Sequence, residues 1–259
     1  MIAVDPILDF LNICIWTGVV EGEKPVNVVL VAESSSGKSE ILKHLQCEIS
    51  VFLTDMTTRD LSLIMAQPKK RIVLLSDMQA IFSHKSTVVG TTTQALRNLL
   101  EEGIYNDPFS AQKVNRRFGM ITAIPPAEFG HVNRIFCSGG LNTRFLIFQF
   151  EYKKGTIAKI HDAVEKGTAD DERREKPLRL PEDGEYKKIV IPPKVARQCR
   201  GLAAVLKRDE IGLRVHHQIR ALVMGSAARS KRKVATSEDY EIIAGYAQFL
   251  RKDAETMML

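Results

Sequence analysis

The residues that build disulfide frameworks, zinc sites and membrane anchors are scarce in this sequence. Its four cysteines are scattered and form no C-x-x-C pair, which excludes the common zinc-binding spacings and a disulfide scaffold and predicts a reducing, cytoplasmic environment. No apolar run reaches the roughly 18 residues of a membrane-spanning helix, so we expect no membrane partner. The first residues include Asp5 and Asp9 and lack the basic start of a secretory signal.

Internal repeats and low-complexity tracts are also absent, and the composition is that of a globular protein, with 44% hydrophobic and 26% charged residues. The charge is unevenly distributed. Residues 1–150 hold 14 basic and 14 acidic side chains, so the whole net charge of +6 belongs to the remainder of the chain. Such asymmetry indicates either a polyanionic partner such as nucleic acid or a basic, solvated surface.

Five short apolar runs rich in β-branched residues alternate with helical patterns. Continuous apolar runs of this length are typical of strands buried on both faces of a parallel sheet. The runs are residues 26–31, 49–53, 72–75, 118–123 and 145–150, and the helical patterns between them are 38–46, 58–66 and 91–102. An amphipathic helix over residues 5–16 precedes them. The alternation predicts a doubly wound α/β domain with a five-stranded parallel sheet.

The chain changes character after the fifth run. A helix over residues 156–166 leads into a mixed-charge stretch, 167–176, that is typical of a solvated linker. Three helices come after it, over 194–206, 212–228 and 237–252, and Thr236 with Asp239 predicts a capping box at the last. We therefore divide the chain into a core at 1–155, a helix and charged linker at 156–190, and a small helical domain at 191–259.

A phosphate-binding loop follows the first strand. Strand, small-residue loop and helix form the context in which backbone N–H groups cradle phosphates. Lys38 would contact the β- and γ-phosphates of ATP, and the Ser39 hydroxyl would bind Mg²⁺. Gly37 would adopt a backbone conformation that larger residues avoid. The nucleotide-binding segment consists of Ala32, Glu33, Ser34, Ser35, Ser36, Gly37, Lys38, Ser39 and Glu40.

The third strand ends in a single acid, Asp77. A carboxylate at this position holds the Mg²⁺ shell or polarises the attacking water. If Ser76 takes the metal-associated position, Asp77 stands where a water-activating acid is expected, and if Asp77 is the metal-associated acid, Met78 replaces the base. A structural alternative makes Asp77 the N-cap of the next helix. Many P-loop ATPases carry two adjacent acids at this position, and this chain has only one. We therefore expect ATP hydrolysis to be slow or to use an acid from elsewhere.

The order of these elements resembles AAA+ ATPases, in particular the branch of minichromosome-maintenance helicases and MoxR-like proteins. Three later segments carry the resemblance. Residues 118–126 are similar to the sensor strand, which makes Thr122 the polar sensor, and 141–145 are similar to the segment that carries the arginine finger, which makes Arg144 that finger. Residues 213–219 are similar to the start of a lid helix, whose Arg214 would contact the γ-phosphate. The resemblance implies a P-loop NTPase core with a helical lid.

An arginine finger acting in trans implies that the protein assembles with itself into a ring or filament, and a hexamer-like ring is the expected form. In the helicase branch a hairpin before the sensor strand carries basic residues into a central pore. By that match Lys113, Arg116 and Arg117 are candidate contacts to DNA phosphates, although surface solubility explains them equally well. The structural alternative for Arg144 is a salt bridge at the end of the sheet, and for Arg214 it is a solvated arginine on a helix.

Three hypotheses for the function are consistent with the sequence. The first is a Mg²⁺-dependent ATPase acting as an oligomeric motor or switch in DNA replication or a mobile-element process, such as a helicase core or helicase loader. The second is an assembly module that binds ATP, hydrolyses little and controls a partner by oligomerising, which the single acid at Asp77 favours. A MoxR-like remodeller of a protein client is a third hypothesis.

Overall fold

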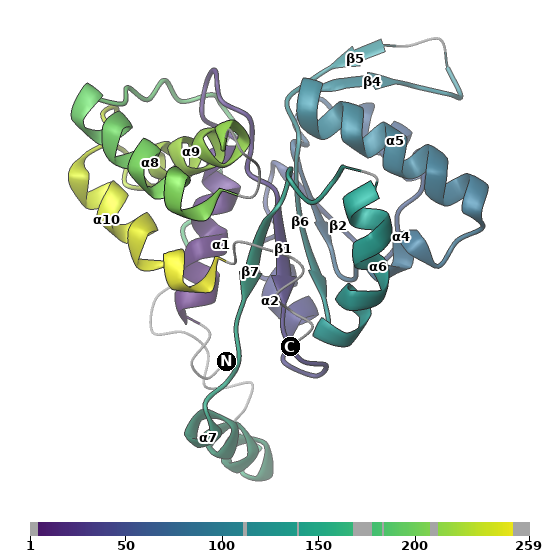
Figure 1. Ribbon diagram of the computed structural model, residues 1–259, viewed down its shortest axis with the longest axis horizontal. Coiled ribbons are helices and arrows are strands. Elements are labelled where there is room, and N and C mark those ends of the chain that lie inside the picture. The colour runs from purple at the N-terminus through teal and green to yellow at the C-terminus, as the bar shows by residue number, and fades with distance from the viewer. Residues whose placement is uncertain are drawn as a thin grey trace.

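The centre of the molecule is a five-stranded parallel sheet, as the sequence predicts (Figure 1). The computed structural model describes residues 5–110, 113–138, 140–167, 178–182, 184–207 and 212–250. The strand order is β2-β3-β6-β1-β7, and every neighbouring pair is parallel. The strands are β1 (Val28–Val31), β2 (Ser50–Leu53), β3 (Ile72–Leu75), β6 (Gly119–Ile124) and β7 (Leu146–Gln149). All five predicted strands are therefore confirmed, each within two residues of its expected bounds.

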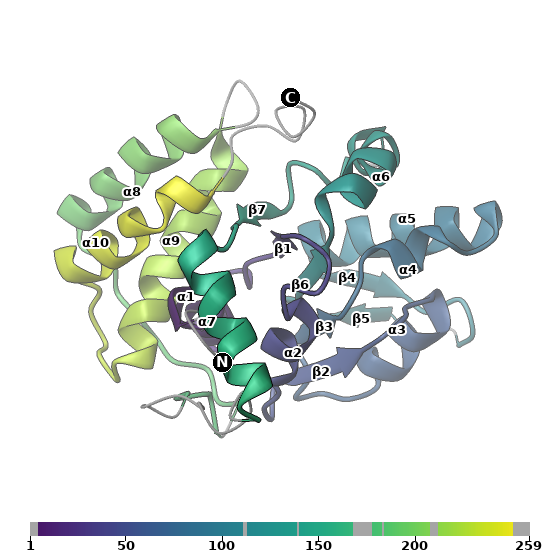
Figure 2. The same ribbon diagram turned by 90° about the horizontal axis from the view of Figure 1, so that it is seen from below.

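Helices cover both faces of the sheet, so its inner strands are apolar on both sides (Figure 2). One face packs against α3 (Thr58–Met65), α4 (Gln79–Phe82), α5 (Ser86–Glu102) and α6 (Pro126–Ser138). The other packs against α1 (Asp5–Thr17) and α2 (Lys38–Lys43), and behind α1 lie α8 (Pro193–Leu206), α9 (Leu213–Arg229) and α10 (Ser237–Gly245). The two faces form separate hydrophobic cores, and the sheet lies between them.

The first helix is not the amphipathic surface helix that the sequence suggests. From Ile7 to Trp16 its side chains are buried, apart from the half-buried Asp9. The reason is that α1 lies between the sheet and α9, with apolar partners on both sides. At Gly225 of α9 a Cβ would lie 2.9 Å from the Ile13 carbonyl oxygen, so the close contact of the two helices requires glycine there.

The three predicted C-terminal helices are present as α8, α9 and α10, and the capping box of Thr236 and Asp239 is confirmed. The last helix ends at Gly245 instead of continuing to residue 252, and a 3₁₀ turn, η1 (Ala247–Phe249), comes directly after it. These helices share one continuous core with α1 and the sheet. Most of the predicted charged linker, at 168–177, lies outside the described residues, as does the end of the chain from 251.

The α6 helix is not foreseen in the sequence, and α4 was considered only as the structural alternative for Asp77. The α6 helix begins immediately after the sensor-like strand, where the sequence offers Pro125 and Pro126. A helix tolerates proline in its first turn because the N–H of that position has no partner inside the helix. The proline pair therefore marks a helix start rather than a break.

An antiparallel hairpin of β4 (Ile104–Asn106) and β5 (Lys113–Asn115) lies between α5 and β6, which confirms the hairpin expected before that strand. At the opposite, carboxyl end of the sheet, α7 (Lys154–Glu165) extends away from the body and is almost wholly exposed (Figure 1). None of the described helices combines the length and apolar character needed to cross a membrane.

Candidate functional site

A tight loop joins β1 to α2 at the carboxyl end of the sheet. The Ser36 N–H donates to the Glu33 carbonyl at 3.2 Å and closes a turn inside the loop. Gly37 has φ +79° and Ser35 has φ +62°, both in the left-handed region. A Cβ on Gly37 would meet nothing within 4 Å, so glycine is required there for its backbone conformation rather than for space. The loop has the geometry expected of a phosphate cradle.

Lys38 folds back over this loop. Its Nζ donates to the carbonyl oxygens of Ala32 at 2.8 Å and Glu33 at 2.7 Å. Burial lowers the pKa of Lys38, while the charges of Asp77, Glu128 and Glu33 oppose the shift. An ammonium held only by neutral carbonyls, with carboxylates nearby, can exchange those partners for phosphate oxygens, which bind a cation more strongly.

The sheet topology sets the two sides of this site. Because β6 lies between β1 and β3, the phosphate loop and the acidic segment stand on either side of its carboxyl end. The Ala32 N–H donates to the Ile124 carbonyl at 3.4 Å, and the Met78 N–H donates to the Ala123 carbonyl at 2.9 Å. The last two residues of β6 thus tie the loop and the acidic segment together.

Asp77 follows β3 at this edge. Its Oδ1 accepts a hydrogen bond from the Gln79 N–H at 2.9 Å, so one oxygen supports the start of α4, close to the structural alternative considered from the sequence. The N-cap position itself belongs to Met78. Met78 is fully buried in the core, so the position after Asp77 places an apolar side chain away from the site. The carboxylate of Asp77 nevertheless acts on Lys38.

Four buried polar atoms around the loop have no hydrogen-bond partner among the described residues. They are Ser36 Oγ, Thr122 Oγ1, Glu128 Oε2 and Gln149 Oε1. Ser36 belongs to the loop, Glu128 to the first turn of α6, and Gln149 is the last residue of β7, whose Cα pairs with Val31. Buried polar groups are normally hydrogen-bonded. Unpaired ones also occur elsewhere among the described residues, as at Asn12 and Thr92, and these four are the ones on the loop or on the strands and helix beside it.

Tyr152 braces the loop, although no pattern in the sequence points to it. Its hydroxyl donates to the Ser36 carbonyl at 2.9 Å across 116 residues of sequence. Its ring stands edge-on to Phe150, with centroids 5.6 Å apart, and burial raises its pKa. The phenol therefore remains protonated and continues to donate to the loop.

The residues present fit a Mg²⁺ that arrives with nucleotide phosphates. Within the described ranges, no three His, Cys, Asp or Glu side chains gather in a way that could hold a metal alone. Mg²⁺ in nucleotide sites commonly takes one or two carboxylates, and phosphate oxygens and waters complete its shell. Ser39 is exposed at the start of α2, and Asp77, which follows β3, supplies a carboxylate donor close to Lys38.

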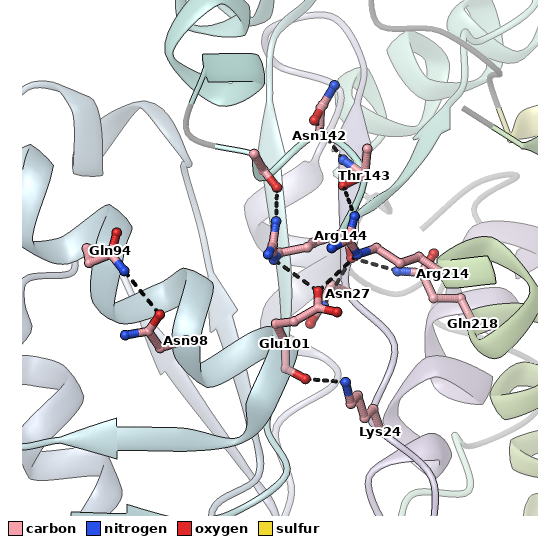
Figure 3. Close-up of polar contacts among 11 residues, drawn as sticks. Lys24, Asn27, Gln94, Asn98, Glu101, Asn142, Thr143, Arg144, Arg214 and Gln218 are labelled. Carbon is pink, nitrogen blue, oxygen red and sulfur yellow. Dashed lines mark hydrogen bonds and ion pairs between the residues drawn. The ribbon is translucent and has the colours of Figure 1, made fainter. Parts of the chain in front are cut away.

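Arg144 and Arg214 lie at the opposite, amino edge of the sheet (Figure 3). Arg144 immediately precedes β7, and its carbonyl accepts hydrogen bonds from Asn27 Nδ2 at 3.1 Å and Gln218 Nε2 at 2.6 Å. Parallel strands of four residues, about 13 Å long, separate this edge from Lys38. The structure thus places Lys38, Asp77 and Thr122 toward the carboxyl end of the sheet. Arg144 and Arg214 lie at its amino end.

Both arginines face Glu101. Its Oε2 lies 3.2 Å from Arg144 Nε and 3.0 Å from Arg214 Nε. Arg214 also donates to Thr143 Oγ1 at 3.1 Å, and Arg144 donates to the Gly140 carbonyl. Burial lowers the pKa of Arg144, Glu101 opposes this shift, and Arg214 adds to it. The salt bridge that was the structural alternative for Arg144 is therefore formed within the single subunit, and Arg214, expected as a solvated helix arginine, shares the same carboxylate.

A cavity of about 540 Å³ opens beside this pair, between the sheet and α9. Five Lys and Arg residues and two Glu residues line it, so its charge is net positive, and Arg220 is paired with Glu23 at 3.2 Å. The charged and titratable residues of the lining are Glu23, Lys24, Glu101, Arg117, Arg144, Arg214, His217 and Arg220. The amino edge therefore offers a cationic recess that is separate from the phosphate loop.

The three basic residues proposed for DNA contact have different surroundings. Lys113 is exposed on β5, and Arg117 is exposed beside the cationic recess. Arg116 instead donates to the carbonyl oxygens of Met65 at 2.8 Å, Gln67 at 2.6 Å and Lys70 at 3.1 Å. These bonds engage its guanidinium with the end of α3, so in this structure Arg116 supports the chain there.

The sequence matches no protein-family model and no curated protein. The interpretation of both edges therefore depends on their own residues.

Proposed function

We propose that this protein is a P-loop NTPase of the AAA+ type that binds ATP at the β1–α2 loop and works as an oligomer. One observation carries the proposal: Lys38 covers a loop surrounded by buried polar atoms without partners among the described residues. Triphosphate oxygens would replace the carbonyl partners of Lys38 and meet the backbone N–H groups of the loop. Ser39 and Asp77 would hold Mg²⁺, which when bound neutralises phosphate charge during hydrolysis.

The place of Arg144 and Arg214 supports a site completed between subunits. Phosphoryl transfer needs positive charge around the γ-phosphate. Both arginines lie beyond the reach of the phosphate loop of their own subunit, but they line an open recess at the other edge. A head-to-tail contact would bring this recess to the loop of the next subunit and generate a ring or filament.

The client we favour is DNA, engaged by an ATP-driven motor or switch in replication or a mobile-element process. Lys113 and Arg117 are exposed near the hairpin and would contact phosphates rather than bases. The competing proposal is an ATP-dependent assembly module with little turnover, or a MoxR-like remodeller of a protein client. Arg144 favours this alternative, because its side chain is only 12% exposed and is occupied by Glu101.

ATP binding is tested by titrating a fluorescent ATP analogue into the purified chain and into Lys38→Ala. Loss of a charge-assisted contact weakens binding by about 10- to 100-fold. Lys43→Ala is the matched control, because Lys43 lies on the same short helix, exposed and paired with Glu40. Equal affinity of Lys38→Ala and the parent chain would contradict the proposal.

Turnover and assembly separate the motor from the module. For a motor we expect ATP hydrolysis that single-stranded DNA stimulates and that salt weakens steeply. For a module we expect ATP to increase the sedimentation coefficient without appreciable phosphate release. Stimulation by protein but not by DNA would favour the remodeller.

A further inference from the structure

Glu128 lies next to the carboxyl edge of the sheet, at the start of α6. That helix begins at Pro126, two residues after β6 ends at Ile124, and the Phe129 N–H donates to the Pro125 carbonyl at 2.9 Å. This bond closes the first turn and fixes Glu128 just past the end of β6. That strand end is also where the phosphate loop and the Asp77 segment are tied together.

The charge of Glu128 reaches the phosphate loop. Among the carboxylates that raise the pKa of Lys38 it is second only to Asp77 and precedes Glu33, which belongs to the loop itself. The carboxylate therefore lies near Lys38, as that of Asp77 does, but comes from a different element. A second acid stands close to the loop even though the sequence places none beside Asp77.

The Glu128 carboxylate is buried at one oxygen and uncommitted. Its Oε2 has no hydrogen-bond partner among the described residues. A favourable interaction with the positive end of α6 explains a glutamate in a first turn. That interaction would be equally favourable if the carboxylate were exposed to water. It therefore does not explain why one oxygen is buried without a partner, or why the carboxylate lies near Lys38. Two further unpartnered hydroxyls, those of Thr122 and Ser36, lie at least nine-tenths buried around the same loop.

We propose that Glu128 is the carboxylate that activates the attacking water, and so completes the acidic pair that Asp77 begins. The proposal rests on the proposed ATPase function. As the water oxygen bonds to the γ-phosphorus, the bond from that phosphorus to the β,γ-bridging oxygen breaks, and ADP leaves with the electron pair. Glu128 accepts a proton from the water and returns it to the released phosphate.

Asp77 and Glu128 make different contacts, which suit them to different roles. Asp77 commits one oxygen to the Gln79 N–H and keeps the other for the metal shell. Glu128 keeps an oxygen free for water. The fully buried Met78 leaves the position beside Asp77 without a base, so the carboxylate from α6 fills the role.

The test compares ATP turnover and ATP affinity in the parent chain, Glu128→Gln and Glu238→Gln. Loss of a general base lowers kcat by about 100-fold or more, while a neutral isostere keeps ATP affinity within about threefold of the parent. Glu238 is the matched control, because it is an exposed first-turn acid of α10, paired with Arg232. Its replacement leaves kcat unchanged. Thermal unfolding verifies that each variant is folded.

A second variant guards against a folding defect. Glu128→Ala opens space for a small carboxylate, and added formate restores part of its turnover if the lost group acted on water. Formate has no effect on the parent chain or on Glu238→Gln. A purely structural role of Glu128 gives no such rescue.

The outcomes separate the two proposals. Absence of saturable ATP binding by the parent chain contradicts the ATPase function itself. Binding and turnover in the parent with kcat of Glu128→Gln within threefold of it contradicts only the role of Glu128. A parent chain that binds ATP, assembles and releases no phosphate also overturns that role, because no water is then activated.

Discussion

Arg144 and Arg214 meet at a single carboxylate oxygen, Glu101 Oε2, at 3.2 and 3.0 Å from their Nε atoms (Figure 3). Two guanidinium groups this close repel each other unless an anion lies between them. Glu101 comes from the end of α5, and the arginines precede β7 and open α9. Under the proposed action in trans, a phosphate of a neighbouring subunit would replace this carboxylate as the anion between the two arginines.

Replacing Glu101 by Gln removes the shared counter-charge. We expect a loss of about 1–3 kcal/mol in the free energy of unfolding, less than for a fully buried pair because the Arg214 side chain is 41% exposed. Urea denaturation measures the change. Glu102→Gln is the control, since that neighbour is exposed at the same helix end. Equal effects of the two substitutions would show that the shared oxygen is unimportant.

Mixing inactive subunits tests whether the arginines act on the next subunit. Lys38→Ala subunits keep both arginines, and Arg144→Ala or Arg214→Ala subunits keep the loop. If the site is completed in trans, each variant alone loses at least about tenfold in ATPase rate, and the mixture regains part of it. Arg59→Ala, exposed on α3, should keep the parental rate. A mixture no faster than its components speaks against action in trans.

Of the three basic residues before β6, we expect Lys113 and Arg117 to affect DNA binding and Arg116 to affect stability. Lys113→Ala and Arg117→Ala should each weaken binding to single-stranded DNA and reduce the slope of log K against log[salt] by about 0.7. Arg116→Ala should instead destabilise the fold, because it leaves three carbonyls of the α3 end without their donor. Fluorescence anisotropy at several salt concentrations and thermal unfolding measure the two effects. Identical DNA affinity for all three variants and the parent would remove DNA from the proposed function.

The five strands could be predicted because each is a short apolar run buried on both faces. The loop between β1 and α2 could be predicted as well, because the strand, the left-handed Gly37 and the helix that follows are adjacent in the chain. The α6 helix could not, since the Pro125–Pro126 pair resembles a strand end as much as a helix start. Glu128 was missed with that helix, although a proline at the first position and an acid two residues later were visible signals.

The contacts made over long separations could not be read from the sequence. Arg214 and Glu101 are 113 residues apart, and Tyr152 and Ser36 are 116 apart. Local patterns contain no information about such pairs, because the topology of the sheet decides which ends meet. For the same reason the sequence could suggest phosphate contacts for Arg144 and Arg214, but it could not show that both lie at the amino end of the sheet.

Cysteine reactivity gives a test of the core. Burial raises the pKa of the Cys199 thiol to about 11, and it raises the pKa of Cys14 as well. Because the thiolate is the reactive form, both should resist a disulfide reagent at pH 8 in the native protein and react on unfolding, whereas the half-buried Cys47 reacts first. Uniform labelling of the native chain would contradict this packing.

The raised pKa of Cys199 also affects the stability of the fold at alkaline pH. The folded state holds the Cys199 proton up to about pH 11, while the unfolded thiol releases it near its ordinary pKa of 9.0. The folded state therefore binds more protons between these values, and the contribution of Cys199 to stability, complete below pH 9, is lost as pH rises through this window. Cys199→Ala should flatten that part of the curve of unfolding free energy against pH.

Removing the hydroxyl of Tyr152 tests the brace behind the phosphate loop. In Tyr152→Phe the Ser36 carbonyl loses its donor, while the ring keeps its edge-on contact with Phe150. A net hydrogen bond of about 0.5–1.5 kcal/mol that orders the loop corresponds to a roughly two- to tenfold loss in ATP affinity. Tyr186→Phe is the control, because its ring keeps its place beneath the Arg71 guanidinium, 3.8 Å from the ring centroid. Titration of both variants with the fluorescent ATP analogue gives the comparison. If Tyr152→Phe binds ATP as tightly as Tyr186→Phe, the loop keeps its shape without the brace, and the backbone conformations of Ser35 and Gly37 suffice to hold it.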